Sequence, residues 1–262
     1  MGMCVWALCV GATDYADIDQ YAYEAPVLKS KMGLSKLVRY LVKPYRTDEE
    51  KARVLLAWIV YNIDYDDFKY KAIEDDLDRT KKKDKDLYIP QNDILETRTG
   101  VCEDIAQLYK KMAELAGLNA VVIHGNAGHG MTYDQFESKE GAHAWNAVKI
   151  NRKWEYVDPT WAIDGEDTHS LGDISKKKEY NKTIKERKKK GSDVKLPREG
   201  RLVNDEWFLT DHEEMIKTHF PDDEQWQLQK KKVTKEEFLG LNRKELYQAK
   251  REYKKQQRKN VR

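Results

Sequence analysis

The chain has 262 residues, of which 40% are hydrophobic and 10% aromatic, so it is long enough to bury a sizeable core. Its 48 basic and 46 acidic residues leave a net charge of only +2, which predicts no specific nucleic-acid partner and no general attraction to acidic membranes. No apolar run reaches the roughly 18 to 20 residues that span a bilayer, so the sequence predicts no transmembrane segment. Partners must be sought at local sites.

Residues 1–12 form an apolar stretch that ends in the small residues VGA. This ending resembles a signal-peptidase site, although the basic start of a typical secretory signal is missing. We expect a short signal peptide and a protein that is secreted or held in the periplasm or cell envelope; the alternative is a buried N-terminal strand or helix in a cytoplasmic protein. Cleavage after Ala12 would remove Cys4 and Cys9 and leave Cys102. A lone thiol in an exported protein indicates a reactive cysteine.

Two segments near the start of the chain predict helices. Segment 34–45 carries apolar residues on one stripe and ends near Pro44, which favours a short helix. Segment 47–66 begins with Thr47 as a helix start signal, continues with three acidic residues, and then places apolar residues at helical spacing. We expect this second helix in the core.

Three stretches are dominated by charged residues. Residues 71–86 and about 176–200 are rich in lysine, and we expect them to be solvated excursions from a single domain over residues 13–240. Residues 241–262 form a basic C-terminal tail. Contact with nucleic acid or an anionic surface is the alternative role for such lysine runs.

Cys102 comes directly before a predicted amphipathic helix that stops at Gly117. The apolar residues that recur there in steps of three and four are Ile105, Leu108, Met112 and Leu115. Thr99 is the predicted N-cap, which places Cys102 in the first helical turn. Free backbone N–H groups and the helix dipole favour a thiolate at that position, and the same N–H groups would stabilise an oxyanion.

Segments 141–150 and 153–161 are rich in strand formers and flank two turn residues, so they predict an antiparallel hairpin. With a two-residue turn, Asp158 lies opposite Trp145. His143 then points to the same face as Asp158 on a diagonal, where backbones are about 7 to 8 Å apart. The hairpin therefore predicts a contact between the imidazole and the carboxylate.

Each of these residues alone has a simpler explanation. A cysteine in an amphipathic helix is usually a small core residue, and a lone histidine in a strand usually packs in the core. The combination is more informative, because a nucleophile at a helix start is followed by a base and a carboxylate on one hairpin. The residues predict a triad of Cys102, His143 and Asp158.

Segments 97–125 and 143–161 resemble the core of the transglutaminase-like superfamily, whose motif blocks surround a catalytic cysteine, histidine and aspartate. Segments 47–66 and 207–228 extend the resemblance, which is to the bacterial branch related to kyphoscoliosis peptidase. It implies a papain-like α+β fold with the nucleophile at a helix N-terminus, packed on an antiparallel sheet.

The resemblance also implies roles for the matching residues. Cys102 would be the nucleophile, His143 the general base and then acid, and Asp158 the group that fixes the imidazole. Tyr65 is the candidate donor to the oxyanion, with a packing role as the alternative. Trp145 and Trp161 would wall the substrate cleft and pack the sheet.

Three other histidines are not expected to be catalytic or to bind a metal. His212 occupies a position where relatives are expected to carry a proline, which puts the local turn in doubt. His124 and His129 lie among glycines that indicate a mobile loop rather than a zinc site. No calcium loop of the DxDxDG kind is present, so we expect neither a metal nor a cofactor.

The predicted chemistry is acyl transfer on peptide or carboxamide bonds of proteins or peptides. The same triad serves a protease or amidase and a crosslinking transglutaminase, which differ in the acceptor. We favour hydrolysis. The alternative is a non-catalytic module that uses the same cleft to bind a partner polypeptide.

Overall fold

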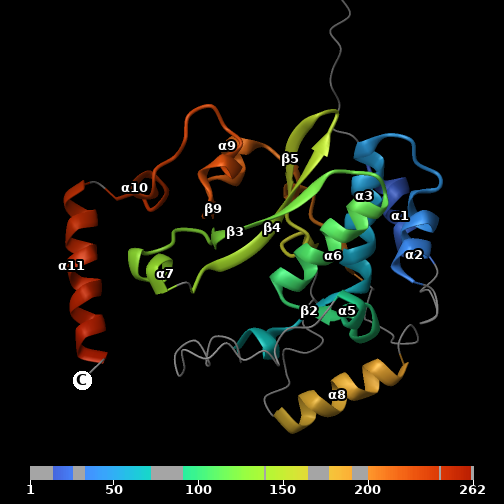
Figure 1. Cartoon of the computed structure of the whole chain (residues 1–262), viewed down its shortest axis with the longest axis horizontal. Coiled ribbons are helices and arrows are strands. Elements are labelled where there is room, and N and C mark those ends of the chain that lie inside the picture. Colours follow the sequence, from blue (N-terminus) through green and yellow to red (C-terminus); the bar gives the residue numbers. More distant parts are fainter. Residues whose placement is uncertain are drawn as a thin grey trace, which may run out of the picture.

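The computed structural model describes residues 14–25, 33–71, 91–138, 140–164, 177–190, 200–241 and 243–260. Its centre is a five-stranded antiparallel sheet in the order β8-β5-β4-β3-β9 (Figure 1). The strands of this sheet are β3 (Ala120–Ala127), β4 (Ala142–Ile150), β5 (Lys153–Val157), β8 (Phe208–Thr210) and β9 (His219–Pro221). Shorter strands form two further pairs, which are β1 (Asp64–Tyr65) with β2 (Thr99–Gly100) and β6 (Ile163–Asp164) with β7 (Leu202–Val203).

Helices pack against this sheet and lie between several of its strands in the chain. The α-helices are α1 (Ala16–Glu24), α2 (Leu34–Val42), α3 (Asp48–Asn62), α5 (Gln91–Thr97), α6 (Cys102–Leu115), α7 (Tyr133–Ser138), α8 (Lys177–Lys190), α9 (His212–Met215), α10 (Lys235–Phe238) and α11 (Arg243–Asn260). Two 3-10 helices within the described residues are η3 (Asp205–Trp207) and η4 (Glu224–Gln227). None of the helices in the described ranges is long and apolar enough to cross a membrane. Helices packed on an antiparallel sheet confirm the predicted α+β class.

Helix α3 is the centre of the helical layer. Every residue from Ala52 to Asn62 is buried, and a helix buried on all sides needs neighbours on all sides. Helices α1, α2 and α6 supply them (Figure 1). The predicted start at Thr47 is confirmed, because its hydroxyl accepts the Glu50 N–H at 3.1 Å and the Glu50 carboxylate accepts the Thr47 N–H at 2.9 Å. The helix predicted within 34–45 is α2.

The β4–β5 hairpin has the predicted register. Asn151 and Arg152 form the turn with φ angles of 49° and 69°, and Ile150 pairs with Lys153. Two residues with positive φ are typical of a tight hairpin turn whose twist matches the strands. Since side chains alternate along a strand, this register brings His143 and Asp158 to one face of the sheet.

The structure agrees to different degrees with the expectations for the segments dominated by charged residues. Of residues 71–86, all but Lys71 lie outside the described residues, as do residues 1–12. Residues 177–190 form α8, whose basic side chains are mostly exposed, as expected. The prediction of a purely solvated excursion is nevertheless wrong for Tyr180, whose hydroxyl donates to the Asp66 carboxylate at 2.9 Å. Most of the basic tail forms α11, which packs beside α7 (Figure 1).

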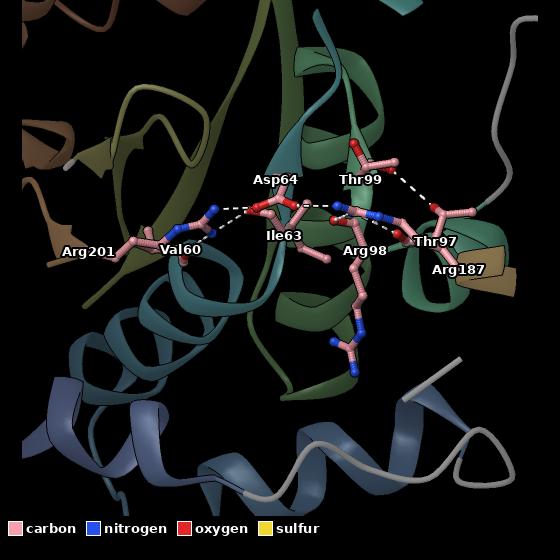
Figure 2. A network of polar contacts seen from close by, with 8 residues as sticks. All are labelled: Val60, Ile63, Asp64, Thr97, Arg98, Thr99, Arg187 and Arg201. Carbon is pink, nitrogen blue, oxygen red and sulfur yellow. Dashed lines mark hydrogen bonds and ion pairs between the residues drawn. The ribbon is translucent and has the colours of Figure 1, made fainter. Parts of the chain in front are cut away.

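A buried carboxylate, Asp64, joins segments that are far apart in the chain. Arg201 donates to one of its oxygens, and Arg187 of α8 donates to the other at 3.0 Å from the opposite side (Figure 2). The same guanidinium groups donate to carbonyls at the C-terminal ends of α3 and α5. We call Asp64, Arg187 and Arg201 the Asp64 clamp. It fixes β1 beside β2, directly ahead of α6.

Candidate active site

Strand β2 leads into α6 and thereby positions Cys102. Cys102 is the first residue of α6 and is partly exposed, which confirms its predicted place in the first turn. Tyr65 of β1 pairs with Gly100, two residues before the thiol. A Cβ atom on Gly100 would lie 2.7 Å from Ile94 and 2.9 Å from Asp104, so only glycine allows this close approach.

The predicted N-cap at Thr99 is wrong. Thr99 belongs to β2 and is buried, because the parallel pairing with β1 takes up this part of the backbone. Val101 is the N-cap residue instead, and its N–H is accepted by the Asp104 carboxylate at 3.1 Å. Lys69 donates to the same carboxylate at 2.6 Å, and both side chains are almost fully buried. This ion pair supports the helix start on which Cys102 lies.

His143 and Asp158 meet as the hairpin predicts. Nε2 of His143 lies 2.6 Å from Oδ2 of Asp158, and the carboxylate is fully buried. The other oxygen of Asp158 accepts the backbone N–H groups of Thr160 at 2.8 Å and Trp161 at 3.0 Å. Backbone donors therefore fix the carboxylate, and the carboxylate fixes the imidazole.

Cys102 contacts the same imidazole. Burial alone would lower the pKa of His143, but the charge and hydrogen bond of Asp158, together with a hydrogen bond to Cys102, raise that pKa well above its usual value. Burial would raise the pKa of Asp158, yet its interactions with His143 and His219 hold that pKa well below the usual value. Because Nε2 of His143 is taken by Asp158, Nδ1 is the nitrogen left for the thiol. A cationic imidazole placed between a carboxylate and a thiol is one of the environments in which cysteines react as nucleophiles.

A second histidine reaches the same carboxylate. His219 lies on β9, and its Nε2 is 3.0 Å from Oδ2 of Asp158, the oxygen that also contacts His143. Its side chain is fully buried. Asp158 thus has four partners, two on each oxygen.

The family model of the transglutaminase-like superfamily matches residues 35–159, which include Cys102, His143 and Asp158. The chain belongs to the transglutaminase-like superfamily. Human kyphoscoliosis peptidase is 31% identical over 217 residues, covering 82% of this chain and 27% of that protein. Hillarin of Drosophila melanogaster is 29% identical over 232 residues, covering 87% of this chain and 24% of that protein.

These two curated relatives are much longer than this transglutaminase-like chain, which spans about a quarter of their length. A solved structure described as the crystal structure of a TGase superposes with a TM-score of 0.37 and 15% identity, covering 66% of this chain and 39% of that chain. The predicted superfamily is confirmed. The bacterial branch stays a prediction.

The three other residues expected around the transglutaminase-like site have different environments. Tyr65 is close enough to Cys102 that burial, and after it the charge of the thiol, raise the pKa of the phenol. Its hydroxyl therefore stays protonated and can donate a hydrogen bond. Trp161 is partly exposed, with its ring centroid 5.6 Å from that of His143. Trp145 is fully buried, so it packs the sheet and does not wall an open cleft.

The three other histidines of the sequence analysis contact residues outside the triad. His212 contacts the Leu228 carbonyl at 2.8 Å and Glu155 at 3.1 Å. His124 contacts Glu103 at 2.7 Å, and His129 stacks near Trp161 with ring centroids 5.8 Å apart. None of the three takes part in the group formed around Asp158.

Within the described ranges, one group of potential metal ligands has all its ligand atoms within 4.8 Å of one another, and it consists of His143, Asp158 and His219. The Nε2 atoms of His143 and His219 both approach the same carboxylate oxygen, Oδ2 of Asp158. Protons on the two nitrogens account for that geometry, because each N–H then has an acceptor.

Sequence reasoning missed His219 in this transglutaminase-like domain. Its strand β9 pairs with β3, nearly a hundred residues earlier, with Ala127 opposite His219. The segment 207–228 belonged to the resemblance, but nothing in its local pattern indicates which strand it joins. A histidine within a short run of strand formers was the available signal, and it does not identify the carboxylate partner.

Proposed function

We propose that this transglutaminase-like domain is a cysteine-nucleophile acyl-transfer enzyme that acts on peptide or carboxamide bonds of proteins or peptides. One observation carries the proposal. The imidazole of His143 is held at 2.6 Å by a buried, ionised carboxylate and contacts a thiol at the N-terminus of α6. This arrangement supplies a thiolate, a proton donor and backbone N–H groups together.

The mechanism follows from the protonation states. The Cys102 thiolate attacks the carbonyl carbon, and the resulting oxyanion is stabilised by N–H groups at the start of α6 and by the Tyr65 hydroxyl. The C–N bond then breaks, and the imidazolium of His143 gives its proton to the leaving nitrogen. Asp158 keeps the imidazole oriented and stabilises its charge. The product is an amine or ammonia and a thioester on Cys102.

The second half of the reaction decides the class of enzyme. Neutral His143 takes a proton from water, hydroxide attacks the thioester, and the acid and the free thiol are released. A primary amine in place of water would give a new amide bond. We favour hydrolysis, because the human relative is called a peptidase and no DxDxDG calcium loop is present in the sequence.

The competing function is a protein-binding module that retains the triad residues without turnover. Partial exposure of Cys102 supports the enzyme, because a thiol that only packs the core has no need to reach solvent. The longer relatives make a binding role worth testing, since the shared domain covers only about a quarter of each.

Thiol reactivity tests the proposal. The purified chain would be labelled with an iodoacetamide probe across pH 4 to 9 and the modified peptide mapped. We expect fast labelling of Cys102 in the folded chain near neutral pH, much faster than labelling of the unfolded chain. Asp158→Asn should slow the labelling, and unfolded chain gives the reference rate. Labelling that requires denaturant would favour the binding module.

We also propose that the protein is exported after cleavage near Ala12. The basis is the apolar segment 1–12 with its VGA ending. Mass spectrometry of protein from the native host should find an N-terminus near Thr13 outside the cytoplasm. An intact Met1 or Gly2 in the cytosolic fraction would contradict export.

A further inference from the structure

The Asp158 carboxylate accepts more hydrogen bonds than the contact with His143 alone would provide. Its Oδ1 atom accepts two backbone N–H groups, and its Oδ2 atom lies 2.6 Å from His143 and 3.0 Å from His219. The backbone donors fix one edge of the carboxylate. His219 shares Oδ2 of Asp158 with His143, and the proposed mechanism gives His219 no role.

The protons on His219 can be assigned from its partners. Asp158 is ionised, so its Oδ2 atom can only accept, and Nε2 of His219 must carry a proton. Burial lowers the pKa of His219, and the neighbouring His143 and His129 also oppose a second proton, outweighing the attraction of Asp158. His219 is therefore neutral. Its Nδ1 atom is then an acceptor, and the Thr218 hydroxyl, 2.8 Å away, donates to it in preference to the Met215 carbonyl, which is 3.3 Å away.

Aromatic side chains fix the plane of the His219 ring. The ring centroids of Trp161, Trp145 and Trp207 lie 4.5, 5.0 and 5.3 Å from that of His219. With Thr218 at one nitrogen and three indoles around the ring, the Nε2–H group has little freedom to turn away from Asp158. A fixed neutral donor at a catalytic carboxylate is a built feature of the site.

We infer that His219 is a positioning residue, a neutral Nε2–H donor that holds Oδ2 of Asp158 in line with His143. This inference rests on the proposed acyl-transfer function. Its effect is twofold. The extra donor keeps the carboxylate ionised to lower pH, and it fixes the direction from which the carboxylate orients the imidazole.

Two variants separate the hydrogen bond from the size of the side chain. His219→Gln can place an amide N–H near the position of Nε2, whereas His219→Met fills similar space without a donor. The measurement is the rate of Cys102 alkylation by iodoacetamide against pH, with thermal unfolding of each variant. His212→Gln is the matched control, because His212 lies away from Asp158.

For His219→Met we expect alkylation about tenfold slower at pH 6, because one hydrogen bond to a charged acceptor is lost. The acid limb of the profile should also move up by about one pH unit, because Asp158 with one donor fewer orients the His143 imidazolium less firmly. His219→Gln should keep the limb within about a quarter of a unit of the wild type. A purely structural role would lower the melting temperature of both variants without moving the limb.

An unchanged pH profile in a folded His219→Met variant would overturn the inference. If that variant does not fold, Thr218→Val serves, because it leaves Nδ1 without its donor and should slow alkylation through a disordered tautomer. Nitrogen-15 spectra of the wild-type histidines give a readout that needs no activity. A proton on Nε2 of His219 supports the inference, and a proton on Nδ1 alone overturns it.

The same experiments separate failure of the inference from failure of the proposed function. A wild-type chain whose thiol alkylates no faster than a denatured one refutes the acyl-transfer proposal, and the His219 tautomer is then still decided by the nitrogen-15 spectra. If the wild-type thiol is reactive and the His219→Met variant has the same pH profile of alkylation, only the positioning role is refuted.

Discussion

Replacing Asp158 with asparagine changes one oxygen to an NH2 group and leaves the shape of the side chain. Asp158 accepts from four donors, two at each oxygen. Whichever way the asparagine amide turns, its NH2 group faces two other donors. The backbone N–H groups cannot move, so the amide oxygen is expected to stay with them and the NH2 group to face His143 and His219.

The size of the effect can be worked from these contacts. A hydrogen bond to a charged partner contributes about 1.5–3 kcal/mol, so losing both partners of Oδ2 costs about 3–6 kcal/mol. Part of this cost is offset because the neutral asparagine no longer buries a charge. We expect the free energy of unfolding to fall by about 3 kcal/mol with the fold kept. In a serine protease triad the same change lowers turnover about 10⁴-fold, and we expect a loss of at least about 10² here.

The stability loss should depend on pH with a defined sign. The pKa of Asp158 is held below its ordinary value of 3.8, so its contribution is complete above that value and is lost as the pH falls toward the folded pKa. The pKa of His143 is raised above 6.5, so its contribution is complete below that value and is lost as the pH rises toward the folded pKa. The free energy of unfolding of the wild type should exceed that of Asp158→Asn by the largest amount between about pH 4 and 6.5.

The assay is urea unfolding at pH 3, 5.5 and 9, together with alkylation of Cys102 at pH 6. Asp205→Asn is a suitable control, since the Asp205 side chain is mostly exposed and pairs with Arg53, not with a triad residue. An Asp158→Asn variant with alkylation within threefold of wild type, or a stability difference that does not vary with pH, would refute the reasoning.

Three further changes test separate parts of the site. Cys102→Ser should abolish acyl-enzyme formation seen by mass spectrometry, while its melting temperature stays within about 2 °C of wild type because the thiol is partly exposed. Tyr65→Phe should lower the acylation rate about 10²-fold with little change in stability if the hydroxyl binds the oxyanion, and an unchanged rate would leave Tyr65 a packing residue. Lys69→Met should lower the free energy of unfolding by about 3–5 kcal/mol in urea, because it leaves the Asp104 charge buried and unpaired; a loss under 1 kcal/mol would contradict this.

Local patterns predicted the parts of the site that local structure builds. The helix start before Ile105 and the register of the β4–β5 hairpin both depend on a few neighbouring residues, so spacing predicted that Cys102 lies in the first turn and that His143 and Asp158 share a face. The hairpin is the clearest case, because a two-residue turn fixes which side chains share a face.

What depends on distant segments was not predictable from spacing. The local pattern favoured Thr99 as the N-cap, but Thr99 pairs with Asp64 of β1 instead. His219 reaches Asp158 only because β9 pairs with β3 at the edge of the sheet. Tyr180 lies in a lysine-rich run whose composition predicts solvation, yet one hydroxyl finds a partner at Asp66. Pairing across a hundred residues leaves no periodic trace in one sequence.

The Asp64 clamp has a practical consequence for crystallising this protein. Replacing flexible lysine and arginine side chains on a surface helix is a common way to promote crystal contacts, and α8 offers many of them. Arg187 must be left out of such a set, because it holds a buried carboxylate and the carbonyls that end α5. Shortening the chain to remove residues 177–190 would take away the same support and loosen the strand pair ahead of Cys102. Lysines 182, 185 and 189 are the safer choices for substitution.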